Sequence, residues 1–373
     1  MVEKDREKIM NLLSEYSGPS LVFDENKFIS NLSRIRKASQ RTNTHVVMAA
    51  KSCTLDISRR IAMKYLSGFE VSNSREFAGL PDQNHHKESL LFVTNPILGC
   101  DHSYLFNKHY RTFVHVDSFH QFLELQKIER PLEFGIRLSV DEEGAINYQR
   151  RDVVTSRFGI SFDQIGEIMQ EAAASHHRLR GVHVHHQRKR VDVKAFHVTT
   201  KCILECIPDV EQFEYINLGG GLSGIGIEGF EGFLAQIRSE IPKKIKLIFE
   251  PGSLLFQGVV SAIGKIMNIK KIRNSYVLFM DISKECHLKW SDPVPLLPQS
   301  RTGKFTYSIS ICGPTCFEGD LIGQYKMKSD SKSFPLYVGQ VIHFLNVESY
   351  SQAWNTEFNG IPRAQIMWQQ QAE

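Results

Sequence analysis

Short apolar runs alternate with longer amphipathic segments between residues 20 and 252. Apolar, β-branched runs of about four to eight residues are typical of buried strands, and apolar positions three or four residues apart are typical of helices. Strands are predicted at 20–28, 45–50, 68–73, 90–96, 111–118, 132–140, 179–186, 214–221 and 245–252, and helices at 1–18, 25–39, 55–66, from 74, 119–127 and 162–175. This alternation predicts an α/β fold with a parallel sheet, and eight such units predict a (β/α)8 TIM barrel.

The pattern changes after residue 254. Strand-like runs without long helices between them occur at 254–272, 275–283, 305–315, 320–325 and 340–347. Such a series predicts a second domain of mostly antiparallel β-structure, a sandwich or a barrel. We therefore expect residues 26–253 to form the (β/α)8 barrel, and residues 1–25 with 254–373 to form the β domain.

The composition is that of an ordinary globular protein. The chain has 373 residues, 42% of them hydrophobic, and a net charge of +4, too small to indicate binding to nucleic acid. Its start, MVEKDREKIMNLL, lacks the apolar segment of a signal peptide, and no apolar run approaches the roughly 18–20 residues that span a bilayer. Seven cysteines are scattered without a framework. We therefore expect a cytoplasmic protein with no membrane partner.

Lys51 follows directly on the apolar run 46–50, which delivers an ammonium group to the end of a buried strand. One interpretation is that the side chain simply emerges into water. The other is a desolvated lysine with a lowered pKa, which forms a Schiff base with a carbonyl group. This stretch alone does not decide between the two.

Polar and special residues collect at the carboxyl ends of the predicted barrel strands, namely Lys51, Glu70, Arg137, His185, Gly219, Gly220, Gly221 and Glu250. Active sites of (β/α)8 barrels lie at that face. With Gly224 the glycines match GxGxxG, but GLSGIGIEGFEGF is a poor helix start, which argues against a dinucleotide site. The alternatives are a turn whose backbone N–H groups bind a phosphate, and a turn with positive φ values and no ligand.

A metal site is a further interpretation of the run HVHH at 183–186, together with Cys312 and Cys316. On a strand, His183 and His185 point to one side and His186 to the other. No second pair of ligands has zinc-like spacing, so we expect no metal. A histidine at a barrel mouth is more often packed and hydrogen-bonded, and here it could also lie flat on a planar cofactor.

A series of motifs occurs in one order along the chain. It comprises the lysine after a short strand, FEVSNSRE, SRFGI, RGVHVHH, LGGG, EPG, CGPTC with an aspartate four residues on, and ESYSQAWNTEFNG. Together these motifs resemble the fold-type III pyridoxal-phosphate decarboxylases, the ornithine/diaminopimelate decarboxylase family. The resemblance extends over residues 20–360 and depends on the order of the motifs, since none is specific alone. It implies an alanine racemase-like barrel, pyridoxal 5'-phosphate as cofactor, and a homodimer with shared active sites.

The resemblance assigns roles in the barrel position by position. Lys51 corresponds to the lysine that forms the Schiff base with the cofactor, and Glu70 to an acidic residue near it. His185 corresponds to the histidine that stacks on the pyridine ring. Glu250 corresponds to the carboxylate that keeps the pyridine nitrogen protonated, so that the ring accepts electrons. Gly219 to Gly221 match the phosphate-binding glycines, and Arg137 is a further candidate for cofactor binding.

Further roles fall on the β domain. Cys316 corresponds to the cysteine that a partner subunit donates, whose thiol can return a proton to the substrate. The alternative is that Cys316 is a small buried apolar residue, as most free cysteines are. Tyr350 corresponds to the tyrosine that reaches the phosphate. Arg157 and Asp320 match an ion pair that crosses the dimer interface.

The sequence departs from the family at the phosphate-binding positions. The arginine usually found after Glu-Pro-Gly is Ser253 here, and the usual Gly-Ser after the histidine strand is Gln187 and Arg188. Phosphate binding must therefore differ, and Arg188 is a candidate anion ligand. The alternative is that Arg188 faces solvent within the basic run 188–190.

The sequence also departs from the family near Cys316. Relatives that act on basic amino acids usually carry an acid after this cysteine, where this chain has Phe317, with Glu318 one place later. The stretch 286–293 offers His287 and Lys289 where such enzymes often present an acid. A site of this charge disfavours a protonated distal amine.

We therefore predict a carboxy-lyase that removes the α-carboxylate of an amino acid with an acidic or acyl-capped side chain. A citrate-conjugated diamino acid of siderophore biosynthesis is one such substrate. The alternatives are a decarboxylase of free diaminopimelate, ornithine or lysine, a catalytically inactive regulatory homologue, and an amino-acid racemase on the same barrel.

Overall fold

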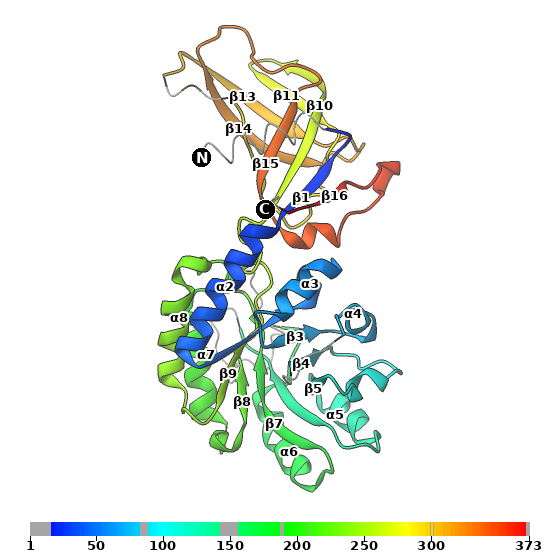
Figure 1. The fold of residues 1–373 in the computed structure, drawn as a ribbon, viewed down its shortest axis with the longest axis vertical. Coiled ribbons are helices and arrows are strands. Elements are labelled where there is room, and N and C mark those ends of the chain that lie inside the picture. Colours follow the sequence, from blue (N-terminus) through cyan, green and yellow to red (C-terminus); the bar gives the residue numbers. More distant parts are fainter. Residues whose placement is uncertain are drawn as a thin grey trace. The chain divides into compact units, whose positions relative to one another are not determined.

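The computed structural model describes residues 16–82, 89–141, 156–186, 190–207, 209–298, 300 and 302–370. The chain divides into two compact units, drawn in Figure 1. The barrel unit is Ile29–Leu255, and the sheet unit joins Met1–Phe28 to Phe256–Glu373. The helix predicted at 1–18 falls almost wholly outside the described residues. Among the described residues, no helix has the length and apolar character needed to cross a membrane.

Eight parallel strands close the barrel in chain order, and the last strand pairs with the first. They are β2 (Thr44–Ala49), β3 (Gly68–Val71), β4 (Ser89–Thr94), β5 (Tyr110–Val116), β6 (Glu133–Leu138), β7 (Arg178–Val184), β8 (Tyr215–Asn217) and β9 (Lys246–Phe249). Most of their residues are buried, as in a parallel sheet covered on both faces. The closed barrel confirms the predicted fold.

Helices follow most barrel strands. They are α2 (Glu25–Thr42), which leads into β2, then α3 (Asp56–Met63), α4 (Ser74–Ala78), α5 (Phe119–Gln126), α6 (Phe162–Ala174), α7 (Val193–Cys206) and α8 (Gly226–Glu240). Short polar side chains cap three of them, because Asn73, Ser118 and Asp192 accept hydrogen bonds from backbone N–H groups of the first turn. Such caps satisfy donors that a helix start leaves without a partner.

Helix α8 begins inside the glycine-rich stretch that the sequence marks as a poor helix start. It runs from Gly226 to Glu240 and buries Phe230, Phe233 and Leu234. That expectation is therefore wrong. Tertiary burial of an apolar face outweighs the low helix propensity of glycine, which costs about 1 kcal/mol per residue.

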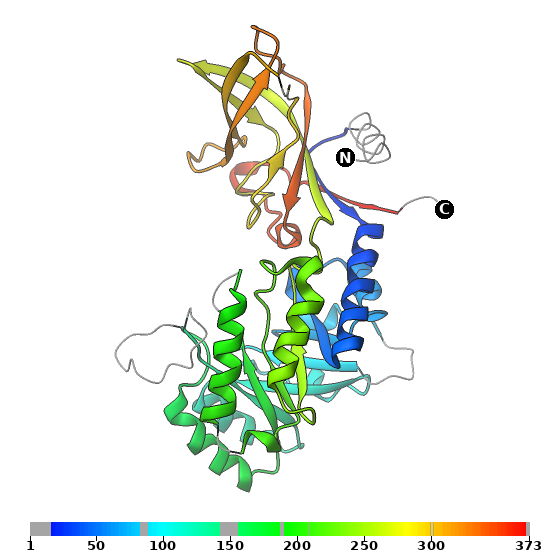
Figure 2. The same ribbon diagram turned by 90° about the vertical axis from the view of Figure 1, so that its left-hand side faces the viewer.

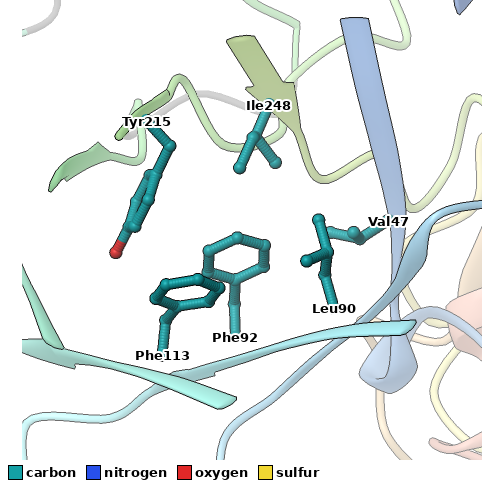
Figure 3. Packing of buried hydrophobic residues seen from close by; sticks show 6 residues of the cluster. All are labelled: Val47, Leu90, Phe92, Phe113, Tyr215 and Ile248. Atoms are coloured by element: carbon teal, nitrogen blue, oxygen red, sulfur yellow. The ribbon is translucent and has the colours of Figure 1, made fainter. Parts of the chain in front are cut away.

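The barrel interior is filled by an aromatic and aliphatic layer, shown in Figure 3. Its members are Val47, Leu90, Phe92, Phe113, Tyr215 and Ile248, contributed by five strands. The rings of Phe92 and Phe113 stack with centroids 5.3 Å apart, and Tyr215 meets both edge-on. Burying side chains of this size stabilises the fold by roughly 1.5–3 kcal/mol each. This packed layer therefore keeps the barrel strands rigid.

The sheet unit is mostly antiparallel. Its strands are β1 (Ser20–Asp24), β10 (Val260–Ile272), β11 (Ser275–Met280), β12 (Val294–Pro295), β13 (Phe305–Cys312), β14 (Leu321–Ser329), β15 (Val341–Val347) and β16 (Gln365–Gln369). β11 pairs with β13, and β1 with β16, in parallel. Figure 2 shows β1 and β16 side by side. The 3-10 turns η4 (Ser349–Gln352) and η5 (Phe358–Gly360) follow β15.

Candidate active site

Lys51 and Glu70 form an ion pair at the carboxyl ends of neighbouring barrel strands. Strand β2 ends at Ala49, and Lys51 lies on the 3-10 turn η1 (Ala50–Ser52). Ala49 pairs with Glu70 of β3, and Lys51 Nζ lies 2.8 Å from Glu70 Oε2. The Glu70 side chain is 1% exposed and the Lys51 side chain 39%. Burial raises the pKa of Glu70, and the positive charge of Lys51 opposes that shift.

Lys51 is therefore less desolvated than its apolar run predicts. The apolar residues end with the strand, and the turn carries the lysine past it, where its ammonium group reaches both solvent and a buried carboxylate. An amine in this position is accessible to a ligand and already paired with a group that can take up its proton.

Glu250 follows β9 directly and is buried. Asn217, the last residue of β8, donates from Nδ2 to Glu250 Oε1 at 2.6 Å. His183 Nε2, from β7, lies 3.4 Å from Glu250 Oε2. Asn217 thus fixes one oxygen of the carboxylate, and the His183 ring lies beside the other without a hydrogen bond to it. Sequence reasoning missed Asn217, although a polar residue inside an apolar strand just before the glycines is a signal, since such a group needs a buried partner.

A stacked pair of histidines lies beside this carboxylate. The rings of His115 and His183 are 4.3 Å apart and nearly parallel. His115 Nδ1 lies 2.8 Å from Thr94 Oγ1, and its Nε2 lies 3.1 Å from the Tyr215 hydroxyl. Burial holds the pKa of both histidines well below the usual range, so both rings are neutral.

The only trio of metal-ligand atoms found among the described residues is His115, His183 and Glu250, whose atoms lie within 4.8 Å of one another. It differs from the metal site considered from the sequence, which combined the histidines at 183–186 with Cys312 and Cys316. The two cysteines belong to the sheet unit. Both ring nitrogens of His115 already have hydrogen-bonding partners. We interpret the trio as a packed layer of neutral rings beside a carboxylate.

The glycines after β8 form a turn that approaches neighbouring backbone closely. Gly219 has φ +65°, and a Cβ there would lie 2.3 Å from the carbonyl oxygen of Val184. A Cβ on Gly220 would lie 3.0 Å from the carbonyl oxygen of Glu250 and 3.1 Å from the His185 ring. The Gly220 N–H donates to His185 Nδ1 at 3.4 Å. Glycine is thus required at Gly219 by both conformation and space, and a side chain at Gly220 would be tightly crowded.

Arg137 and Asp117 form a buried ion pair, with Arg137 Nη1 2.7 Å from Asp117 Oδ1. The guanidinium also lies over the Phe158 ring, 4.4 Å from its centroid. Arg157 lies over the same ring at 4.3 Å. Sequence reasoning named Arg137 but missed Asp117, which lies just after β5. A buried arginine needs an anion, and that requirement is the signal.

The two histidines after β7 diverge as strand alternation predicts. His185 is half-buried and contacts the glycine turn. His186 Nε2 lies 3.0 Å from Thr199 Oγ1, on α7. Arg188 and Gln187 fall outside the described residues. Ser253, which replaces the family arginine, is half-buried.

The remaining candidates lie in the sheet unit. Cys316, Phe317 and Glu318 are exposed in the loop between β13 and β14, and Tyr350 is half-buried in η4. His287 is buried. Its Nδ1 accepts from the Ser283 N–H, and its Nε2 lies 3.0 Å from the Pro362 carbonyl oxygen.

His287 and Lys289 carry less positive charge than the sequence argument assumed. Burial lowers the pKa of His287, and its two hydrogen bonds fit a neutral ring. Lys289 Nζ lies 2.5 Å from Glu285 Oε2, one turn earlier in the chain. The charge that would repel a distal amine is therefore partly cancelled within this segment.

Two relatives resemble the chain in sequence, although no protein-family model matches it. The carboxynorspermidine/carboxyspermidine decarboxylase of Campylobacter jejuni is 22% identical over 380 residues, covering 94% of this chain and 92% of that protein. The carboxyaminopropylagmatine decarboxylase of a Synechocystis species is 25% identical over 160 residues, covering 40% and 39%. The chain is a homologue of the fold-type III pyridoxal-phosphate decarboxylases.

Solved structures of these decarboxylases share the fold. The lysine/ornithine decarboxylase of Vibrio vulnificus, complexed with putrescine, has a TM-score of 0.76 and 17% identity, covering 99% of each chain. A mutant of SrLDC in complex with pyridoxal phosphate has a TM-score of 0.77 and 17% identity, covering 99% of this chain and 95% of that one. These findings confirm the predicted family, fold, enzyme class and cofactor.

The barrel mouth fits pyridoxal phosphate on observations of its own. The turn after β8 has positive φ at Gly219 and at Gly221, a conformation of backbone turns that bind anions such as a phosphate. Both ring nitrogens of His183, beside Glu250, are buried without a hydrogen-bond partner among the described residues. An accessible amine, a buried carboxylate and a glycine turn are the donor set that this cofactor requires of a decarboxylase.

Proposed function

We propose that the chain removes the α-carboxylate of an amino acid whose side chain is acidic or acyl-capped. The bond between Cα and the carboxylate carbon breaks, CO2 leaves, and a proton is added to Cα. The observation that carries this proposal is the grouping of Lys51, Glu250 and the glycine turn at one end of the barrel. When bound, pyridoxal phosphate accepts the electron pair that CO2 leaves behind.

The residues of the barrel mouth divide this work. Lys51 would hold the cofactor covalently, and Glu70 would take up and return the lysine proton because its carboxylate is buried and paired with that amine. Glu250, fixed by Asn217, would keep the pyridine nitrogen protonated. The turn at Gly219 to Gly221 would bind the phosphate, and His185, which accepts from the Gly220 N–H, would lie against the ring. Arg137, Tyr350 and Arg188 remain proposed cofactor ligands.

The proposed substrate class rests on Phe317. The residue after Cys316 is an apolar ring that is 52% exposed, where relatives acting on basic amino acids carry an acid. A distal ammonium group would find no partner in that side chain, whereas an acyl cap would lose little by contacting it. Since His287 and Lys289 are neutral or paired, the apolar character of Phe317 supports the proposal more than the charge does. Glu318, one residue later, is an exposed acid, and its pairing with a distal ammonium group would favour a free diamino acid as substrate.

A carboxylated polyamine is the second candidate substrate. The names of two sequence relatives, carboxynorspermidine/carboxyspermidine decarboxylase and carboxyaminopropylagmatine decarboxylase, denote substrates of this kind. Like a capped diamino acid, such a substrate carries a substituted side-chain nitrogen.

A competition assay with purified enzyme tests the substrate class. Free ornithine, lysine and diaminopimelate compete with a citryl-capped diamino acid and with carboxynorspermidine, and each product is quantified. The capped acid should exceed the free diamino acids in kcat/KM by about tenfold, or about 1.4 kcal/mol. Preference for a free diamino acid contradicts the proposal, and preference for carboxynorspermidine selects the second candidate. Cofactor binding without turnover of any substrate indicates an inactive homologue.

The active unit is proposed to be a cytoplasmic homodimer in which a second copy supplies the Cys316 loop. Mixing the inactive Lys51→Ala protein with the Cys316→Ala protein, which should keep only a small residual rate, should restore part of the activity, because a hybrid dimer contains one site with both residues intact. Subunit exchange is confirmed with differently tagged chains. No recovery after exchange would mean that each chain supplies its whole site.

A further inference from the structure

Asp320 is a buried carboxylate that neither the barrel site nor the proposed chemistry uses. It ends the loop between β13 and β14, four residues after Cys316, and is 3% exposed. The family resemblance assigns it to an ion pair with Arg157 across a dimer interface. Within one chain its two oxygens accept hydrogen bonds from five donor groups.

Three of these donors come from one segment, 283–285. The Ser283 hydroxyl lies 3.0 Å from both Asp320 oxygens. The Lys284 N–H donates to Asp320 Oδ1 at 2.7 Å, and the Glu285 N–H donates to the same oxygen at 3.3 Å. The turn that follows β11 therefore directs three hydrogen-bond donors at the Asp320 carboxylate.

The other two donors come from the loop that carries Cys316. The hydroxyl and N–H of Thr315 donate to Asp320 Oδ2 at 2.8 and 3.3 Å. A Cβ at Gly313 would lie 2.2 Å from the same oxygen, so glycine there leaves room for the carboxylate. The Asp320 backbone closes the loop, because its N–H donates to the Phe317 carbonyl and its carbonyl accepts from the Gly313 N–H.

The same segments are tied to the stretch around η5. The Cys316 N–H donates to Asn359 Oδ1 at 2.8 Å, and the Thr356 N–H donates to the Cys286 carbonyl oxygen at 3.0 Å. Cys316 itself is exposed. Its backbone is thus fixed by Asn359, while the residue itself stays exposed.

We propose that Asp320 is a positioning residue, whose carboxylate fixes the loop 313–320 onto segment 283–285 and so sets where Cys316 presents its thiol. A carboxylate is suited to this role because it accepts several N–H and O–H donors at once, whereas an amide turns two donors of its own toward them. The proposal deepens the proposed function, since it rests on Cys316 serving the decarboxylase site.

The test compares Asp320→Asn with Asp330→Asn, which changes an exposed aspartate in the same sheet unit. Iodoacetamide labelling followed by peptide mass spectrometry reads Cys316 separately from the six other free cysteines. Asp320→Asn should change the labelling rate of Cys316 by about threefold or more, and lower kcat by about tenfold or more with little change in KM. Asp330→Asn should change neither.

A double-mutant cycle separates positioning from general stability. In a Cys316→Ala background, Asp320→Asn should cause almost no further loss of kcat, because the carboxylate acts through the residue already removed. If the double variant instead loses kcat by the product of the two single-variant factors, the proposal is overturned. An unchanged labelling rate combined with weaker self-association would also overturn it, and would assign the carboxylate to an interface. If Asp320→Asn does not fold, Thr315→Val replaces it in the test, and it should change the Cys316 labelling rate and kcat in the same direction by smaller factors. A Thr315→Val protein with the labelling rate and kcat of the wild type overturns the proposal.

Failure of this proposal differs from failure of the proposed function. If no tested amino acid is decarboxylated, the proposed function fails, while the labelling rate of Cys316 still measures whether Asp320 orders the loop. If decarboxylation proceeds and Asp320→Asn changes neither labelling nor kcat, only the positioning role is lost.

Discussion

At the level of single residues, the barrel mouth places each ionised side chain against a partner. Lys51 meets Glu70, Arg137 meets Asp117, and Asn217 donates to Glu250. Glu70, Glu250 and the Arg137–Asp117 pair are buried, so an unpaired charge at any of these positions would cost several kcal/mol. Pairing lets the site keep reactive groups in a buried setting.

Replacing Lys51 by alanine should abolish turnover and remove the visible absorbance of the imine between lysine and cofactor, because the substitution removes the amine that would form that imine. Absorbance spectra and product assays measure both effects. Lys64→Ala, which changes an exposed lysine after α3, is the matched control and should behave as wild type. A Lys51→Ala protein with full activity and an unchanged spectrum would show that the Schiff base forms elsewhere.

Glu250→Gln should retain the cofactor but slow decarboxylation by about a hundredfold or more, because a neutral amide no longer stabilises the charge on the pyridine nitrogen. Single-turnover kinetics and cofactor titration separate the two effects. Glu231→Gln, on the exposed side of α8, is the control. Equal rates in the Glu250 variant and the wild type would remove this carboxylate from the mechanism.

At the level of elements, the turn after β8 is the tightest constraint on the site. Gly219 combines a positive φ with a carbonyl oxygen 2.3 Å from where a Cβ would be. Gly219→Ala should therefore lower the unfolding free energy by about 1–3 kcal/mol and weaken cofactor binding, as measured by urea unfolding and cofactor release.

Gly232→Ala is the matched control for the turn. Gly232 lies within α8 with nothing near its would-be Cβ. Alanine there should stabilise the helix by roughly 0.5–1 kcal/mol. Equal effects of the two substitutions would contradict the role of the turn.

The sequence predicts elements well where apolar runs are long and bounded. Every barrel strand was found, because buried parallel strands are continuously apolar. The sequence pattern does not predict helix α7, and it disfavours helix α8. The stability of these two helices comes from packed residues such as Phe196 and Phe233 rather than from local helix propensity.

Site residues divide in the same way. Strand-end positions such as Lys51 and Glu250 could be named from the sequence, because topology places them. Their partners could not: Asp117 and Asn217 are recognisable only once neighbouring strands fix which side chains converge. The donors around Asp320 come from segment 283–285 and from Thr315, which are far apart in the sequence, so no local pattern connects them.

At the level of the whole molecule, several buried histidines make the fold sensitive to acid. Burial lowers the pKa of His186 and of His343 to about 4 and holds that of His115 and His183 well below 6.5. The folded chain therefore binds fewer protons than the unfolded chain below pH 6.5, so stability falls as pH drops from there. A shift such as that of His186 corresponds to roughly 3 kcal/mol.

We therefore predict that the unfolding free energy is nearly constant from pH 8 to 7 and declines steadily from pH 6.5 to 5, as measured by urea unfolding. The decline should be smaller in His186→Phe. His120→Gln, which changes an exposed histidine, should leave it unaltered. A flat profile down to pH 5 would mean that the buried rings do not govern acid stability.

Strand β1 takes its place between β10 and β16, and β16 ends at Gln369, near the end of the chain. On the ribosome, β1 therefore emerges long before β10 and β16, and it lacks both neighbours until they follow. Until then its row of backbone hydrogen-bonding groups is open to wrong partners, including other nascent chains. In the barrel unit each strand pairs with the next one along the chain, and only β2 has a partner, β9, that is made much later. Losses during synthesis should therefore trace mainly to the sheet unit.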